Sequence, residues 1–186
     1  MDRRVAVSPR LEGLHAMIQN FLKEYQSYRR IGEKALAQVS DDALNRVIGK
    51  DNNSVAMIVR HISGNLRSRF TDFLTSDGEK PWRDRDSEFA DVTYDRQAVG
   101  QMWAEGFQVV EEALAALTDA DLERQVLIRD EPHTVHRALC RSVAHTAYHV
   151  GQIVLLARIL NQGDWQWISV PKGKSQEFNQ EMMKGK

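Results

Sequence analysis

Cysteine is almost missing from this chain, whose 186 residues contain only Cys140. A single cysteine excludes an intramolecular disulfide framework and any zinc site built mainly from thiolates. It also fits a reducing compartment, so we expect a cytoplasmic protein. Because Cys140 lies in an apolar segment with no orienting group in evidence, we interpret it as a small core residue rather than a nucleophile.

The sequence also lacks an excess of either charge and any long apolar run. Lys and Arg number 25 against 26 Asp and Glu, for a formal net charge of −1. Such a balance gives no global field, so we expect neither nucleic acid nor a membrane surface as a partner. The longest uninterrupted apolar run, residues 153–157, is too short to cross a bilayer, and the first residues have no secretory apolar segment. We therefore expect a soluble protein.

Proline and glycine are scarce, with 4 and 11 residues, and long stretches are rich in helix-favouring side chains. Apolar residues recur at spacings of three and four, which predicts four long amphipathic helices. Their expected limits are Pro9 (capped by Ser8) to Gln38, Asn53 or Ser54 to Thr75, Tyr94 or Asp95 to Leu117, and Thr134 to Asn161. The fold predicted from them is an all-α four-helix bundle with long crossover loops.

Two further segments complete the predicted organisation. A short apolar run followed by a turn-forming Asp-Glu-Pro, within residues 124–135, predicts a small β-hairpin before the last helix. We expect one domain over residues 1–186, with a core at about 9–162, a tail at 163–186 that packs on it, and a frayed end at 182–186.

The charged connection over residues 76–93 is longer than most loops in compact domains. Trp82 and Phe89 would be exposed in a plain linker, so one interpretation is that the loop folds over one end of the bundle and is pinned by these aromatics. A solvated crossover connection is the alternative. The Arg67 to Arg69 and Arg83 to Arg85 stretches have acids nearby, so we interpret them as solvated faces, with the alternative that Arg69, on the face of His61, meets an anionic substrate.

His145 and His149 lie in the last apolar segment, within Ala144-His145-Thr146-Ala147-Tyr148-His149-Val150-Gly151-Gln152. On a helix, four residues turn the side-chain direction by about 400°, so the two imidazoles share a face one turn apart. This spacing suits chelation of one metal ion, although histidines satisfied by core hydrogen bonds or solvent remain the alternative. No Glu follows His145, so the zinc-protease pattern His-Glu-x-x-His is absent.

His61, beside the apolar stripe of the second predicted helix, can supply a third ligand. Three histidines leave a coordination position open, which is typical of a catalytic rather than a structural site. Asn65 and Arg69 share the face of His61, so we take them as candidates for binding a small-molecule substrate. His15, His133 and His136 are weaker candidates, and only His136 is kept, as a residue at the edge of the site.

These residues together resemble the DinB/YfiT-like metal-binding superfamily. The resemblance rests on Asn53-Ser54, His61, Asn65 and the run from His145 to Gln152, and it covers roughly residues 11–179. Asp77-Gly78-Glu79-Lys80-Pro81-Trp82, together with Trp165, Trp167 and the Ser-Val-Pro-Lys-Gly-Lys-Ser segment after them, resembles an uncharacterised branch known as a domain of unknown function.

The resemblance implies a four-helix bundle that holds a divalent metal ion through His61, His145 and His149. Zinc and nickel are the first candidates for this ion. The resemblance also implies a homodimer and, from characterised relatives, a transferase or isomerase that uses a low-molecular-weight thiol as cosubstrate. Two functions remain open. One is a metal-dependent enzyme that activates a small thiol or water for transfer or hydrolysis; the other is a non-catalytic metal-binding or stress-related protein.

Overall fold

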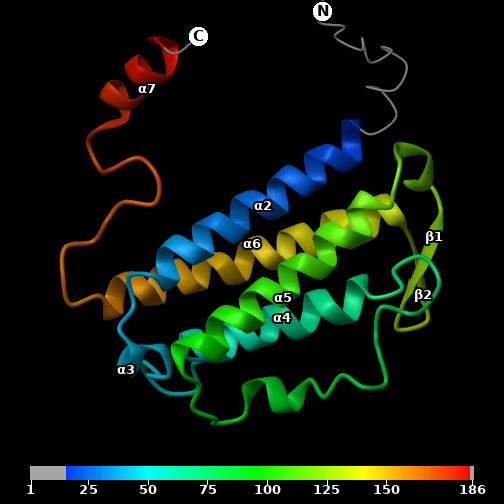
Figure 1. Ribbon diagram of the computed structural model, residues 1–186, viewed down its shortest axis with the longest axis horizontal. Coiled ribbons are helices and arrows are strands. Elements are labelled where there is room, and N and C mark those ends of the chain that lie inside the picture. The colour runs from blue at the N-terminus through cyan, green and yellow to red at the C-terminus, as the bar shows by residue number, and fades with distance from the viewer. Residues whose placement is uncertain (1–15, 185–186) are drawn as a thin grey trace, which may run out of the picture.

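Four long helices dominate the computed structural model, which describes residues 16–184 (Figure 1). They are α2 (Ala16–Leu36), α4 (Val55–Phe70), α5 (Arg96–Ala115) and α6 (Val135–Leu160). The shorter elements are α3 (Asp41–Leu44), η2 (Asp86–Phe89), η3 (Asp119–Asp121), β1 (Gln125–Ile128), β2 (Glu131–Thr134) and α7 (Ser175–Lys184). The prediction of a helical bundle with a small hairpin is confirmed.

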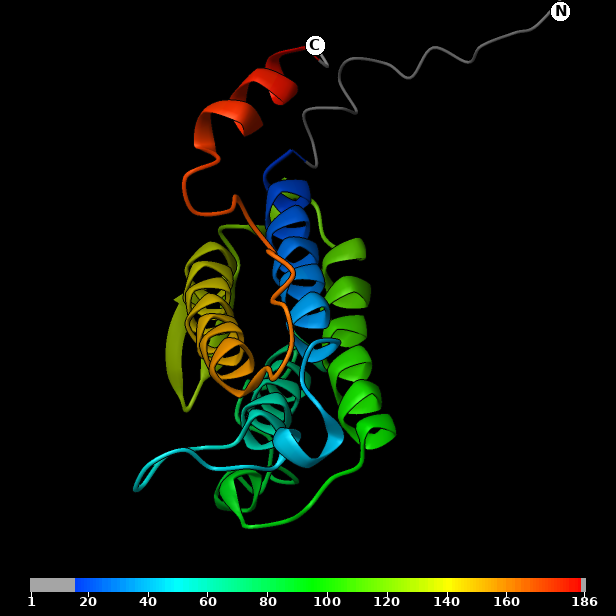
Figure 2. The same ribbon diagram turned by 90° about the vertical axis from the view of Figure 1, so that its left-hand side faces the viewer.

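The four long helices enclose a single core. Helix α2 contacts α5 and α6, and α4 contacts the same two helices, so the four form a closed ring. Figure 2 views this ring obliquely along the helix axes. Its interior is filled by the apolar stripes that the sequence predicted, with Tyr25, Ile62, Phe107 and Ile153 among its fully buried members. This ring is the scaffold on which side chains of α4 and α6 can meet.

Helices α4 and α5 run in the same direction (Figure 1). The connection between them, residues 71–95, therefore has to return along the outside of the bundle. It contains η2, which contacts α4. This geometry explains the unusual length of the connection and brings charged loop residues against the face of α4.

Local capping chemistry sets three predicted helix starts. The side chains of Ser54, Asp95 and Thr134 accept hydrogen bonds from backbone N–H groups of the first turns of α4, α5 and α6. One predicted end is wrong by several residues. Helix α4 stops at Phe70 rather than Thr75, because the chain turns through Asp72 at a φ of 49°.

Helix α2 ends at Leu36, two residues before the predicted Gln38. The predicted start at Pro9, its cap Ser8 and the histidine His15 lie outside the described residues.

The hairpin is present, but its turn differs from the predicted Asp-Glu-Pro. Strands β1 and β2 pair antiparallel with Ile128 opposite Glu131, and Arg129 and Asp130 form the turn with φ values of 57° and 61°. Two positive φ angles are typical of the tight turns that match strand twist. Pro132 lies within β2, opposite Leu127.

The tail after α6 contacts the core through Trp165 and Ile168, which are partly buried. Helix α7 contains no buried residue. Residues 182–184 belong to this helix, and the frayed end predicted for residues 182–186 stays a prediction.

Helix α6 is long and apolar enough, by length and composition alone, to cross a membrane. In the structure it packs against α2 and α4 and carries two of the candidate histidines. We therefore describe it as a core helix of the bundle.

Candidate metal centre

His61, His145 and His149 lie together, as their sequence pattern predicts. One ring nitrogen from each falls within 4.8 Å of the others. The Nε2 atoms of His61 and His145 are 3.3 Å apart. Two nitrogens bound about 2.0–2.1 Å from a tetrahedral ion are separated by roughly this distance, so the cluster fits a divalent ion. Its action as ligand set stays a prediction.

The bundle positions these rings through two helices. His145 and His149 are one turn apart on α6, and His61 projects from the middle of α4 with only 2% of its surface exposed. The contact between α4 and α6 closes the cluster. Ring centroids are separated by 5.2 Å for His61 and His145, and by 4.7 Å for His61 and His149.

His61 is oriented by Glu88, a buried carboxylate of η2. The His61 Nδ1 atom is 2.8 Å from Glu88 Oε2. Burial alone would raise the pKa of Glu88, but hydrogen bonds from His61 and Arg83 outweigh it and lower that pKa. An ionised carboxylate can only accept, so Nδ1 donates and the Nε2 atom of the same ring faces the centre of the cluster.

Arg83 secures Glu88 in turn. Its Nε and Nη2 atoms donate to the two carboxylate oxygens at 2.8 and 2.9 Å, and its side chain is 2% exposed. A bidentate guanidinium contact fixes both position and charge. A continuous series of hydrogen bonds thus runs from Arg83 in the connection through Glu88 of η2 to His61 of α4.

Gly64 makes the approach of Glu88 possible. A Cβ atom at this position of α4 would lie 2.1 Å from Glu88 Oε1, which is far inside contact distance. Any larger residue at this position would displace the carboxylate or the helix.

His149 has a separate partner on its own helix. Its Nδ1 atom is 2.7 Å from Gln152 Oε1, and the Gln152 amide donates to the Tyr148 hydroxyl at 3.3 Å. With an amide oxygen as acceptor, Nδ1 carries the proton and Nε2 is again unprotonated.

Electrostatics keep His145 neutral. Burial lowers its pKa to about 3, and the neighbouring His149, His61, Arg83 and Arg69 act in the same direction. Burial also lowers the pKa of His149. Neutral imidazoles are the form that binds metals, so at neutral pH the cluster can coordinate without first releasing protons from these two rings.

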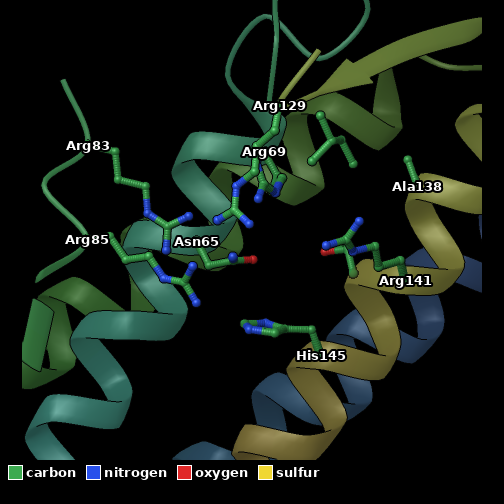
Figure 3. A pocket seen from close by; sticks show the side chains of 10 residues that line it. Asn65, Arg69, Arg83, Arg85, Arg129, Ala138, Arg141 and His145 are labelled. Carbon is green, nitrogen blue, oxygen red and sulfur yellow. The ribbon is translucent and has the colours of Figure 1, made fainter. Parts of the chain in front are cut away.

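A pocket of about 100 Å³ opens beside His145 and includes both predicted substrate-binding residues, Asn65 and Arg69. Figure 3 shows Asn65 and Arg69 above His145, with arginines from other elements around the same space. The structure therefore brings the candidate substrate residues next to the histidine cluster.

Comparison of the sequence with known families identifies the family of this chain. The sequence profile of a family described as "Protein of unknown function (DUF1572)" matches residues 14–174. The chain belongs to the DUF1572 family. No curated protein matches the chain significantly.

Two solved structures are similar in fold to the DUF1572 chain. A DinB-like protein from Bacillus subtilis is similar with a TM-score of 0.61 and 14% identity, over 80% of this chain and 96% of that one. A DinB-like protein from Bacillus cereus has a TM-score of 0.57 and 16% identity, over 79% and 97% of the two chains. The resemblance to DinB-like proteins is confirmed at the level of fold.

The 76–93 segment of this DUF1572 chain folds back on the bundle, but not through both predicted aromatics. Phe89 packs on the His61 ring at a centroid distance of 4.8 Å. Trp82 is 53% exposed, and its ring lies 5.8 Å from the Arg67 guanidinium. The polar residues Glu88 and Arg83 fix the segment instead, so the solvated face predicted for Arg83 is wrong.

The two tryptophans of the tail make their contacts outside the pocket beside His145. Trp165 packs against the core, and the Trp167 ring lies 4.6 Å from the Arg158 guanidinium. Neither residue lines the pocket beside His145.

Two other interpretations of α6 need correction. Cys140 is exposed rather than a core residue, and its Sγ atom is 3.7 Å from His136 Nε2. His136 makes an edge contact with Phe21 and is not among the residues of the pocket, so it does not lie at the edge of the site.

Several residues at the site of the DUF1572 chain were not predicted. Two of them share a helix face with the histidines: Arg141 is four residues before His145, and Gln152 is three residues after His149. That spacing could have identified them. Glu88, Arg85 and Arg129 had no such local signal, because they lie in the connection and in the hairpin turn.

Proposed function

We propose that this DUF1572 protein is a metal-dependent enzyme in which His61, His145 and His149 hold one divalent ion, zinc or nickel. It would activate a small thiol or water for transfer or hydrolysis of a small-molecule substrate. The observation that supports this most strongly is the 3.3 Å separation of the Nε2 atoms of His61 and His145. Glu88 orients the His61 ring, and burial keeps the His145 ring neutral. Three protein ligands also leave a position for substrate.

A bound divalent ion would act as a Lewis acid that lowers the pKa of the nucleophile. The chain's own residues would do the positioning. Glu88 holds the His61 ring through its Nδ1 atom, while Arg83 helps to keep Glu88 ionised. Asn65 and Arg69 would orient the second substrate in the pocket beside His145.

The lining of that pocket favours a thiol over water. None of its ten lining residues is a carboxylate, and the Glu88 oxygens are occupied by His61 and Arg83. His145, which the proposal assigns to the metal ion, is the one imidazole in this lining, so no residue of the lining is left to act as a general base. A thiol, with an ordinary pKa of about 8.5, needs far less help to ionise than water does.

The test is a screen of thiol cosubstrates with electrophiles on protein loaded with zinc or nickel. We expect thiol-dependent turnover that falls at least a hundredfold in His149→Ala. His136→Ala, which removes a histidine of the same helix outside the cluster, should retain the activity of the unmodified protein. Turnover unchanged by His149→Ala would contradict the catalytic role.

The alternative is a metal-binding or stress-related protein without catalysis. In that case all thiols would be inactive, while metal would still bind in a 1:1 ratio and be lost in His149→Ala. The homodimer implied by the resemblance is also part of the proposal, and sedimentation of the full chain would test it.

A further inference from the structure

Five arginines converge on the pocket beside His145. They come from four parts of the fold: α4, the 71–95 connection, the hairpin turn and α6. They are Arg69, Arg83, Arg85, Arg129 and Arg141. Figure 3 shows Arg83 and Arg85 approaching from one side and Arg141 from the other, with His145 below them.

The positive charge of this group is only partly neutralised. Glu79 accepts from Arg129 at 2.8 Å and from Arg69 at 3.4 Å, and Glu88 binds Arg83. Arg85 and Arg141 form no ion pair with a carboxylate in the part of the chain that the structure describes. Two carboxylates therefore pair with three of the five guanidinium groups, and Arg85 and Arg141 are left without a carboxylate partner among the described residues.

Of the two arginines in this group with largely buried side chains, Arg69 is less completely paired than Arg83. The Arg69 side chain is 11% exposed, and its Nη1 atom has no hydrogen-bond partner among the described residues. Burial lowers the pKa of Arg69, and the charges of Arg83 and Arg129 lower it further, against the opposing effect of Glu79. An anion in the pocket would relieve this repulsion and supply acceptors for the unpaired guanidinium groups.

We propose that this pocket binds the anionic end of the substrate, an oxyanion group that carries at least two negative charges, such as a phosphate monoester or a dicarboxylate. Planar guanidinium forks match carboxylate and phosphate oxygens in pairs. The volume of about 100 Å³ suits one such group rather than a large ligand. Because His145 lines the pocket, the rest of the substrate lies toward the histidine cluster.

This inference deepens the proposed function and rests on it for the role of the anion as substrate. A purely structural role for the arginines accounts for Arg83, which secures Glu88, and for Arg129, which pairs with Glu79. A structural role does not account for Arg85 and Arg141, which form no ion pair with Glu79 or Glu88.

Calorimetric titration of the full chain with inorganic phosphate and with malonate tests the proposal, on metal-free and metal-loaded protein. We expect one site per chain for at least one of the two anions, and no binding of uncharged malonamide. Phosphate alone would identify a phosphoryl ligand, and malonate alone a dicarboxylate. Arg141→Gln and Arg85→Gln should each weaken binding about tenfold or more.

Arg137→Gln is the matched control, since Arg137 is an exposed arginine of α6 that does not line the pocket. It should bind the anion like the unmodified protein. Absence of binding by both anions, or equal affinity of Arg141→Gln and Arg137→Gln, would overturn the proposal. Circular dichroism spectra that match the unmodified protein would show that the variants are folded.

The metal-free titration separates this proposal from the proposed function. The arginines do not depend on the ion, so metal-free protein and His149→Ala should still bind the anion. Anion binding by a protein that takes up no metal would refute the proposed function and leave the anion site standing. Metal-dependent thiol turnover with no anion binding would refute the anion site and leave the proposed function standing.

Discussion

Glu88 and Gln152 decide which nitrogen atoms the histidines present to the cluster. Both accept from an Nδ1 atom, of His61 and His149 respectively, so the two Nε2 lone pairs are directed inward. Partners of this kind fix the tautomer of a histidine ligand and raise its basicity. The expected metal affinity thus depends on residues that would not touch the ion.

Glu88→Gln tests this dependence. The substitution keeps the shape of the side chain but removes the negative charge that accepts from His61 and binds Arg83. We expect zinc affinity to fall by about 10- to 100-fold, measured by competition with a chromogenic chelator. Asp86→Asn, an exposed acid of the same η2 turn, is the control, and equal affinities of the two variants would contradict the role of Glu88.

Gly64→Ala tests the close approach of α4 to Glu88. The added methyl group would lie 2.1 Å from Glu88 Oε1, so the free energy of unfolding should fall by about 1–3 kcal/mol in urea titrations. Gly100→Ala has nothing within 4 Å of its new atom and should instead gain about 0.5–1 kcal/mol. If the Gly64→Ala protein were as stable as the Gly100→Ala protein, the close approach of Glu88 to α4 would not contribute to stability.

The long connection and the hairpin are joined by Asp77. Its carboxylate accepts from the backbone N–H groups of Glu79, Arg129 and Asp130 at 2.6, 2.9 and 2.8 Å. The Gly78 N–H also donates to Leu127 O at 2.8 Å. Asp77 thereby fixes the turn that carries Arg129 beside the pocket.

Asp77→Asn should therefore destabilise the protein by about 1–2 kcal/mol at neutral pH. Burial alone would raise the pKa of Asp77, but the backbone hydrogen bonds outweigh it, so its folded pKa lies below the unfolded value of about 4. The stabilisation is complete above that value and is lost as the pH falls through the folded pKa.

Urea unfolding at pH 7, 5 and 3.5 measures this effect. The difference between Asp77→Asn and the unmodified protein should be equal at pH 7 and 5 and smaller at pH 3.5. Asp91→Asn, which changes an exposed acid of the same connection, should show no difference at any pH. A difference that grows toward low pH would contradict the proposed hydrogen bonding.

Local features of the sequence were sufficient for most of the helices. Ser54, Asp95 and Thr134 begin helices by contacts within three residues, and the spacing of His145 and His149 is also local. Their meeting with His61 followed from the resemblance and from the bundle. The path of the 71–95 connection was not predictable, because it depends on contacts such as that of Glu88 with His61, 27 residues earlier. The end of α4 was misplaced for the same reason, since Ser68 donates to the Gly78 carbonyl in that connection.

Across the bundle, a metal ion held by α4 and α6 would link two helices of the ring. Removing it with a saturating chelator should lower the melting temperature of the metal-loaded protein by several degrees, since a ligand at a thousand times its Kd contributes about 4 kcal/mol. Melting of His149→Ala should be insensitive to the chelator. An unchanged melting curve of the unmodified protein would contradict a metal link between the helices.

Anomalous diffraction from crystals of the zinc-loaded protein tests the histidine centre most directly. Data on both sides of the zinc absorption edge should give one strong peak per chain, within about 2.0–2.2 Å of a nitrogen of each of His61, His145 and His149. A fourth position should face the pocket that contains Asn65 and Arg69. Absence of a peak among these three rings, or a zinc ion bound only elsewhere, would contradict the proposal that they form the metal site.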